Sequence, residues 1–403
     1  MRIVFINRFY WPDEQATAQL LTDLAEALAH RGHGVTVIAS GSDRPGGSAS
    51  AEHNAVSVVR VAPGRSGRPG LAAKAWDSLR FFAGAAWSLV RLLRPGDVVI
   101  TLTDPPLFSV AAAVVAGLRR ARLIHWIQDI HPEVLAAVTG ARAALILRPV
   151  RDAAWRAADS CVVLGADMAG LAAERGVDPA RLRVIPNWPP AGLTEPDSSR
   201  VETVREERGL AGKFVVLYSG NLGRVHDMAS LIGLAEQLRT DPHVVILIIG
   251  HGPQKPFLQT QARARGLSNV VFLPPQPRAA LSESLALGHL HVVTLKTGCE
   301  RLVYPSKIYG IAAVGRSLLF IGPRGCDVAL TIESDGLGRA FSPAELAQAA
   351  SYVAVMSTQP QVLAEASRKA AEASSRHGGF ARALARWDEI LSSEELAGKG
   401  GTL

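Results

Sequence analysis

Two successive runs of alternating strand-like and helix-like segments constrain the fold more than any other feature of this 403-residue sequence. In the first run, strand candidates lie at residues 2–7, 35–39, 56–61, 98–101, 123–127 and 161–164. Helical periodicity fills most of the intervals between them. Such alternation predicts a parallel sheet with helices on both faces. The first run therefore predicts one α/β domain over residues 1–190.

The pattern stops in a stretch rich in proline and charge that begins near Trp188 and ends near Arg200. It then restarts, with strand candidates at residues 214–219, 244–249, 270–272, 290–295 and 317–321. This predicts a second doubly wound domain over residues 200–360. Helices within residues 361–403 follow, and we expect them to pack back toward the first domain. Because parallel strands bind ligands at their carboxyl ends, two Rossmann-like domains predict a central cleft between them.

Composition narrows the class of protein. The three cysteines, Cys161, Cys299 and Cys326, form no C-x-x-C pair, and no His/Cys cluster has metal-ligand spacing. We therefore expect a reduced protein that binds no metal. The N-terminus lacks the pattern of a signal peptide, and no apolar run reaches the roughly 18 to 20 residues that span a bilayer. We expect the protein to stay in the cytoplasm.

Residues 71–94 are the candidate for peripheral contact with a membrane. This helical stretch carries aromatic and basic residues together: Lys74, Trp76, Arg80, Phe81, Phe82, Trp87, Arg91 and Arg94. A basic amphipathic helix with aromatic residues suits an anionic interface. The alternative is a helix that covers the sheet through Leu79, Phe82, Ala86, Leu89 and Leu93. Residues 1–190 hold 21 Lys/Arg and 16 Asp/Glu, a modest basic excess without a nucleic-acid recognition motif, so we expect no nucleic-acid partner.

The loop after the first strand is a candidate ligand-binding loop, because first β–α loops often bind ligands in such sheets. Its candidates are Tyr10, Trp11 and Glu14. The alternative is that the aromatic residues pack and that Asp13 or Glu14 caps the next helix. The loop lacks G-x-G-x-x-G, which disfavours a dinucleotide cofactor.

In the second half, the strand at 214–219 runs into Gly220, Asn221, Gly223 and Arg224. Glycines permit close backbone approach, the next helix can receive negative charge at its N-terminus, and arginine binds phosphate through a fork of donors. The strand at 244–249 likewise ends in a loop with Gly250 and Gly252. These loops outline a diphosphate site, with ordinary structural turns as the alternative.

A third candidate loop, residues 297–307, ends in Pro305, Ser306 and Lys307 before another helical stretch. Proline suits a first helical position, and a cation in the first turn is unfavourable unless an anion is bound. Lys307 therefore predicts a bound phosphate, the alternative being a solvated lysine.

Taken in order, these motifs resemble the GT-B glycosyltransferases of family four, and particularly the branch that makes colanic-acid and O-antigen repeat units, which includes N-acetyl-L-fucosamine transferases. The strings that carry the resemblance are NRFYWPDEQATAQLLTDLAEALAHRGHGVTVI, WIQDIHPE, VIPNW, YSGNLGR, GHGP and YPSKIYGIAAVGR. They span nearly the whole chain. The resemblance implies a GT-B fold, with an N-terminal acceptor-binding domain and a C-terminal domain for the nucleotide sugar.

The resemblance also implies retaining transfer, without a cofactor, from a nucleotide diphosphate sugar, with UDP favoured, to a polyprenyl-diphosphate-linked or oligosaccharide acceptor. Arg224 matches the family's diphosphate-binding arginine, and Lys307 is our candidate for the second cation. The family's Glu-x7-Glu motif is lost, since Leu302 and Gly310 occupy its places. Glu300 is left as a candidate for contact with the donor sugar, and a surface role is equally compatible.

The segment 125–133 supplies candidates for the acceptor. Asp129 is our first choice for the group that positions or deprotonates the acceptor hydroxyl. His125 and Glu133 are further acceptor-binding candidates, with a buried histidine and a helix cap as their alternatives. Two other functions fit the same domains: a UDP-sugar 2-epimerase, and a non-catalytic subunit that binds nucleotide sugars.

Overall fold

The computed structural model describes residues 1–41, 51–61, 71–376 and 379–393, and the side chains of helix α2 from Trp76 onward. The chain divides into two compact units. Unit 1 comprises Met1–Pro186 together with the chain from Ala383, and unit 2 comprises Asn187–Arg382. The boundary thus falls at the start of the stretch where periodicity was expected to end. Part of the expected C-terminal segment, residues 377–378 and 394–403, lies outside the described residues.

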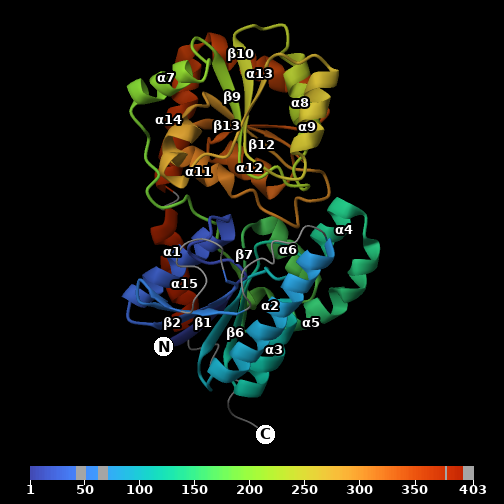
Figure 1. Cartoon of the computed structure of the whole chain (residues 1–403), viewed down its shortest axis with the longest axis vertical. Helices are drawn as coiled ribbons and strands as arrows, with labels where there is room; N and C mark the ends of the chain where they lie inside the picture. Colours follow the sequence, from blue (N-terminus) through green and yellow to red (C-terminus); the bar gives the residue numbers. More distant parts are fainter. Residues whose placement is uncertain (42–50, 62–70, 377–378, 394–403) are drawn as a thin grey trace. The chain divides into compact units, whose positions relative to one another are not determined.

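Unit 1 is built on an eight-stranded sheet in the order β3-β4-β2-β1-β5-β6-β7-β8 (Figure 1). Its strands are β1 (Arg2–Ile6), β2 (Gly34–Ala39), β3 (Ala51–His53), β4 (Val56–Arg60), β5 (Val98–Thr101), β6 (Arg122–Trp126), β7 (Ser160–Val163) and β8 (Leu182–Val184). Only β3 runs antiparallel to its neighbour among these strands. The chain leaves β1 toward β2 on one side and later adds β5 on the other, so the strand order reverses at β1.

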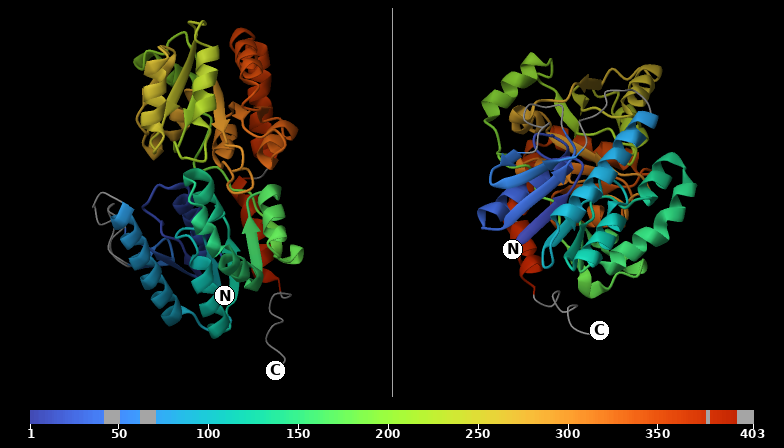
Figure 2. Two further views of the ribbon diagram at one scale, coloured as in Figure 1. Left: turned by 90° about the vertical axis from the view of Figure 1, so that its right-hand side faces the viewer. Right: turned by 60° about the horizontal axis from the view of Figure 1, so that its bottom comes forward.

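Helices connect the strands of this sheet and cover its faces. They are α1 (Ala16–His30), α2 (Leu71–Leu92), α3 (Phe108–Arg119), α4 (Glu133–Thr139), η1 (Arg142–Leu147), α5 (Arg148–Ala157), α6 (Ala166–Glu174), η2 (Pro179–Arg181) and α15 (Gly379–Ser392). Helix α3 lies between α2 and α5. Helix α2 crosses the front of unit 1 in Figure 1 and forms its left edge in the left view of Figure 2.

Helix α15, near the C-terminus of the chain, packs on unit 1. The indole of Trp387 meets that of Trp126 edge to face, with 5.1 Å between ring centroids. The guanidinium of Arg122 donates hydrogen bonds of 2.9 Å to the carbonyls of Ile390 and Leu391. Of the helices expected within residues 361–403, α15 therefore contributes to unit 1, whereas α14 (Pro360–Arg376) packs against α11 and β13 in unit 2.

Unit 2 has a six-stranded parallel sheet in the order β11-β10-β9-β12-β13-β14. Its strands are β9 (Phe214–Ser219), β10 (Val244–Ile249), β11 (Val270–Leu273), β12 (Leu290–Thr294), β13 (Ser317–Ile321) and β14 (Gly338–Phe341). Its other helices are α7 (Ser198–Glu207), α8 (Met228–Gln237), α9 (Lys255–Ala264), η3 (Arg278–Ala280), α10 (Leu281–Ala286), α11 (Lys307–Ala313), α12 (Asp327–Ser334) and α13 (Leu346–Thr358). The order reverses between β9 and β12, and ligands bind at such a switch point in doubly wound sheets.

The predicted α/β class with two Rossmann-like sheets is confirmed. The structure adds β3, β8 and β14, which sequence periodicity did not predict because each is an edge strand of three or four residues. Among the helices in the described part of the chain, none is long and apolar enough to cross a membrane.

Candidate functional site

In unit 2, the loops that follow β9 and β10 pack directly on each other at the switch point. The amide of Gly220 donates to the carbonyl of Ile249 at 3.0 Å, and the amide of Leu222 donates to that of His251 at 2.8 Å. A Cβ atom on Gly250 would overlap the carbonyl oxygen of Gly220, and one on Gly252 would lie 2.7 Å from that of Leu222. These two glycines therefore permit contact between the loops, which is the structural alternative considered for them.

Lys307 is the most unusual charged residue of unit 2. Its Nζ is buried, has no hydrogen-bond partner among the described residues, and lies 3.9 Å from the ring centroid of Tyr218. Burial lowers the pKa of Lys307 to about 7. A Cβ on Gly220 would lie 3.5 Å from this Nζ, so the glycine leaves room for the ammonium group. An ammonium group that lacks a partner in a buried position is costly unless a ligand supplies the counter-charge.

The position of Lys307 in its helix differs from the expectation. Helix α11 begins at Lys307 itself, with Ser306 as the preceding cap residue, so Pro305 is not in the first turn. Glu300 is occupied within its own loop, since its carboxylate accepts a 2.6 Å hydrogen bond from the amide of Gly298. Its position therefore has a local structural reason.

Two neighbours modify the surroundings of Lys307. His226 donates from Nδ1 to the carbonyl of Thr294 at 2.7 Å, and burial followed by the charge of Lys307 lowers the pKa of His226 to about 3. Asp227 caps α8 by accepting hydrogen bonds from the amide and hydroxyl of Ser230 at 3.2 and 2.5 Å. That helix start thus already has its negative group, contrary to the expectation that it would receive a phosphate.

The exposed side of these loops is polar. Asn221 and Arg224 are exposed, Gly223 is partly exposed, and the carbonyl of Asn221 accepts a 3.0 Å hydrogen bond from the Tyr218 hydroxyl. The exposed Arg224, in the loop after β9, and the buried ammonium of Lys307, from the start of α11, therefore both belong to the switch point. This arrangement suits an anion with two phosphates.

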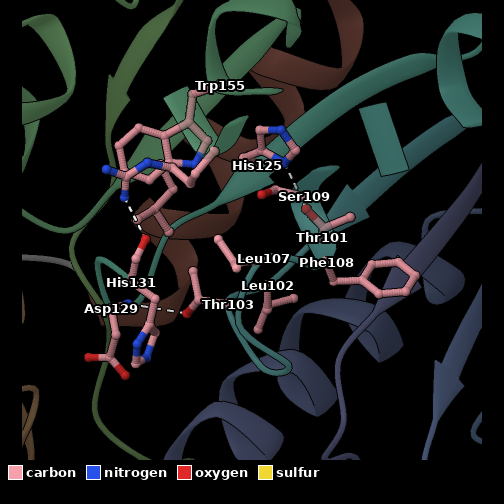
Figure 3. A pocket seen from close by; sticks show the side chains of 12 residues that line it. Thr101, Leu102, Thr103, Leu107, Phe108, Ser109, His125, Asp129, His131 and Trp155 are labelled. Atoms are coloured by element: carbon pink, nitrogen blue, oxygen red, sulfur yellow. Dashed lines mark hydrogen bonds between the residues drawn. The ribbon is translucent and has the colours of Figure 1, made fainter. Parts of the chain in front are cut away.

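In unit 1, a small pocket lies where β5 and β6 end (Figure 3). Its lining residues are Thr101, Leu102, Thr103, Leu107, Phe108, Ser109, His125, Ile127, Asp129, His131, Arg151 and Trp155. Asp129, His131 and Thr103 gather at one end of it in Figure 3. Burial, and then the nearby charge of Asp104, raise the pKa of Asp129 to about 6. A carboxylate with such a pKa can accept a proton from a hydroxyl near neutral pH.

The other two candidates of this segment have structural roles. His125 is 1% exposed, accepts from the Thr101 hydroxyl at 2.7 Å and donates to the carbonyl of Ala154 at 3.2 Å. Burial lowers its pKa to about 4, so it stays neutral. Glu133, the first residue of α4, is 5% exposed and pairs with Arg148 at 3.0 Å and Arg151 at 2.7 Å. His125 thus follows its structural alternative, a buried histidine, whereas Glu133 is not the helix cap that was its alternative, because Pro132 is the cap residue of α4 and Glu133 forms ion pairs instead.

The loop after β1 is also largely engaged by the protein. Tyr10 is fully buried beneath the Arg60 guanidinium, which donates to the carbonyls of Ser40 and Trp11. The indole of Trp11 stacks on His53 with 3.7 Å between centroids. Glu14 remains exposed, and the cap residue of α1 is Gln15 rather than either acid.

The structure also brings residues to these sites that were not among the sequence candidates. In unit 1 they are His131, Thr103 and Ser109, which line the pocket beside Asp129. Burial lowers the pKa of His131. In unit 2, Tyr218 provides the ring on which the ammonium of Lys307 rests. The imidazole of His131 stands two residues after Asp129 in a strand-end loop, a signal that the sequence offered. Among the described residues, no three His, Cys, Asp or Glu side chains are grouped as metal ligands.

Known proteins resemble both units. Residues 16–188 match the family model described as a glycosyl transferase 4-like domain, and residues 201–302 match that of glycosyl transferases group 1. WcaI of Escherichia coli, named as a colanic acid biosynthesis glycosyl transferase, is 26% identical over 341 residues, which cover 78% of this chain and 82% of that protein. WbjE of Pseudomonas aeruginosa, named as a glycosyltransferase, is 27% identical over 252 residues, covering 61% and 62%.

The fold is similar to that of Anabaena Alr3699/HepE, whose structure was determined in complex with UDP-glucose. The two share 18% identity and a TM-score of 0.73, over 97% of this chain and 99% of that one. At this level of identity the similarity supports only the fold, and it does so over nearly the whole chain.

Proposed function

Since the chain belongs to the glycosyltransferases with a GT-B fold, we propose that it moves a sugar from a UDP-linked donor to a lipid-linked or saccharide acceptor in surface polysaccharide biosynthesis. Unit 2 holds the donor and unit 1 holds the acceptor. Configuration at the anomeric carbon is retained, as the resemblance to family four implies. The names of WcaI and of the UDP-glucose complex support the acceptor pathway and the donor class.

Lys307 carries the proposal for the donor. Its buried Nζ has no hydrogen-bond partner in the described chain, and it lies against the ring of Tyr218 near the carboxyl end of β9. A leaving nucleoside diphosphate gains negative charge as its bond to the sugar breaks. A preorganised cation in a site with little water stabilises that charge far better than water does. Arg224, which is exposed on the neighbouring loop, supplies a second cation to the same diphosphate.

Asp129 carries the proposal for the acceptor. In the transfer, the acceptor hydroxyl oxygen forms a bond to the anomeric carbon, the bond from that carbon to the diphosphate oxygen breaks, and the hydroxyl proton passes to the carboxylate of Asp129. Asp129, with His131 and Thr103 beside it, positions that hydroxyl in the pocket of unit 1. We propose that the reaction needs no metal ion, because the two cations of unit 2 neutralise the leaving group.

Thermal unfolding in the presence of UDP tests the donor site. A ligand that binds only the folded state raises apparent stability by RT ln(1 + [L]/Kd), so UDP and UDP-sugars should raise Tm. Lys307→Gln should remove most of this shift, and Lys369→Gln, at an exposed position of α14, should keep it. No shift with any nucleotide sugar would refute the proposal.

Turnover assays separate the remaining alternatives. A transferase releases UDP only when an acceptor is present, apart from slow hydrolysis, and its rate should survive a metal chelator. An epimerase would convert UDP-GlcNAc without an acceptor. A subunit that only binds nucleotide sugars would show the thermal shift with no turnover on any acceptor tested.

A further inference from the structure

One arginine, Arg151 of α5, is almost fully buried in the wall of the unit 1 pocket, where it is 2% exposed. Each nitrogen of its guanidinium group makes a hydrogen bond of 2.7 Å. The Nε atom donates to Oδ1 of Asp152, Nη1 donates to the carbonyl of His131, and Nη2 donates to Oε1 of Glu133. The guanidinium also lies over the indole of Trp155, with 3.8 Å between Cζ and the ring centroid. The protein therefore engages every part of this group.

These contacts leave Arg151 unsuited to bind an anionic substrate. Two carboxylates, those of Glu133 and Asp152, already balance its charge. An arginine that binds phosphate turns its fork of donors toward the ligand, but here both ends of the fork are bonded to protein atoms. A buried ion pair contributes little net stability, because desolvation offsets the attraction of the charges. The arrangement therefore points to a role in holding neighbouring residues in place.

The residues that Arg151 holds belong to the loop that carries Asp129. This loop leaves β6 and enters α4, and its backbone is fixed at two places. At Asp129, the amide donates to the hydroxyl of Thr103 at 3.2 Å (Figure 3). Two residues later, the carbonyl of His131 accepts the bond from Arg151. Because Arg151 comes from α5, later in the chain, its side chain ties the loop to that helix.

We infer that Arg151 is a positioning residue for the acceptor, which binds the carbonyl of His131 and so holds the carboxylate of Asp129 at the pocket. Glu133 and Asp152 in turn fix the guanidinium group. A site of this kind needs supporting contacts that lock its reactive groups in position. The effect on turnover rests on the proposed transferase function, whereas the effect on the loop does not.

Arg151→Lys tests the inference without removing the positive charge opposite the two carboxylates. Lysine offers one nitrogen in place of a planar fork, so it cannot reach the carbonyl of His131 and both carboxylates together. We expect kcat/KM for the acceptor to fall about a hundredfold, because small displacements of a reacting group are costly. The UDP thermal shift, which reports on unit 2, should keep its wild-type size. Arg156→Lys, at an exposed position of the same helix, is the matched control and should change neither measurement.

The ionisation of the loop gives a readout that a general loss of stability would not change. Burial raises the pKa of Asp129 to about 6 and lowers the pKa of His131. A loop released from Arg151 is more solvated, so both pKa values should move toward their ordinary values. The rise of kcat/KM with pH should shift below about pH 6, and NMR titration of the His131 imidazole should give a higher pKa than in the wild type. Arg156→Lys should show neither shift.

Chemical rescue separates a missing guanidinium group from a damaged fold. Arg151→Ala is combined with Glu133→Gln, so that one charge of each sign is removed and no new unpaired charge is buried. Methylguanidinium in solution can enter the space left in the pocket wall and bind the carbonyl of His131. We expect it to raise kcat about tenfold, which is part of the loss. Methylammonium at the same concentration should give no rescue, because it lacks the planar fork.

The possible outcomes distinguish this inference from the transferase proposal. A folded Arg151→Lys variant with wild-type kcat/KM and an unchanged pKa of His131 would overturn the inference and leave the transferase proposal standing. Loss of activity with both pKa values unchanged would also overturn it, since Arg151 would then act on the substrate directly. A wild-type protein without turnover on any acceptor would contradict the transferase proposal, and the titration of His131 would then decide alone whether Arg151 holds the loop.

Discussion

Replacing Lys307 with methionine should make the ligand-free protein more stable and at the same time abolish its response to UDP. The side chains have similar lengths, so Met keeps the apolar stem and removes the ammonium. In the folded chain the pKa of Lys307 is lowered to about 7 by burial, whereas the unfolded chain keeps the ordinary value of 10.5. Folding at neutral pH must therefore either bury a charge or release a proton.

The size of the effect follows from the two pKa values. A shift from 10.5 to about 7 costs about 4 kcal/mol at pH 7, since one pKa unit corresponds to about 1.4 kcal/mol. Loss of the cation–π contact with the Tyr218 ring reduces the gain in stability of the variant by about 1 kcal/mol. Relaxation around the ammonium reduces the penalty further, so we expect Lys307→Met to raise the free energy of unfolding by about 2 kcal/mol. Because the folded pKa is depressed, the cost is full below pH 7 and fades as pH rises toward 10.5, and the gain in the variant should fade with it.

Urea unfolding at several pH values, followed with and without UDP, measures both effects. The transition of unit 2 is analysed separately, because a protein of two units need not unfold in one step. Lys369→Met at an exposed position provides the control, with an expected change within about 0.5 kcal/mol. If Lys307→Met destabilised the ligand-free protein by 1 kcal/mol or more, or kept the UDP response, the assignment of Lys307 to the diphosphate would be wrong.

Three further predictions concern acid stability, the acceptor and the donor loops. Burial lowers the pKa of His291 to about 3, so the neutral ring contributes to stability above about pH 6.5 and this contribution is lost as pH falls. In urea titrations, His291→Gln should therefore reduce the drop in the free energy of unfolding between about pH 7 and about pH 5.5 by about 1 kcal/mol. kcat/KM should rise with pH through about 6 as Asp129 ionises, and Asp129→Asn should abolish this rise. Asp104→Asn should shift the rise to lower pH, because the charge of Asp104 raises the pKa of Asp129. An unchanged pH profile in both variants would exclude Asp129 as the group that acts on the acceptor hydroxyl. Gly250→Ala should lower the free energy of unfolding by about 3 kcal/mol or more and weaken UDP binding, because its Cβ would overlap the β9 loop. Gly266→Ala has open space around its Cβ and should lower the free energy of unfolding by only about 1 kcal/mol.

Much of the fold could be predicted from the sequence because its central strands are continuous apolar runs. The strands at 98–101, 214–219, 244–249 and 317–321 begin and end at the predicted residues, and all four are buried apart from one terminal residue. The antiparallel strand β3 could not be predicted, because its three residues are mostly exposed and pair only with β4. Short edge strands depend on a neighbour rather than on their own periodicity.

The candidate sites were predictable in location but not in the role of each residue. Lys307 and Asp129 follow strands, and strand ends in such sheets are where ligands bind, so their loops could be chosen from sequence. Glu133 looked equally suitable, yet Arg148 and Arg151 engage its carboxylate. The local sequence pattern does not predict these ion pairs, because the arginines come from a different helix. Only the three-dimensional contacts distinguish a carboxylate with a structural partner from one that can act on a ligand.

Within each unit, burial moves the pKa of one titratable group at the strand ends toward neutrality. In unit 1 it raises the pKa of the Asp129 carboxyl to about 6, and in unit 2 it lowers that of the Lys307 ammonium to about 7. The two shifts have the same cause, since burial disfavours whichever form is charged. Each group should gain a proton during the reaction: Lys307 when a diphosphate provides the counter-charge for its ammonium form, and Asp129 when its carboxylate takes up the proton of a hydroxyl. At pH 8 only about one tenth of the ligand-free Lys307 is protonated, so UDP binding should take up about 0.9 proton. Calorimetry in buffers of different ionisation enthalpy measures that uptake directly, and binding of UDP without proton uptake would refute the idea that Lys307 is charged by its ligand.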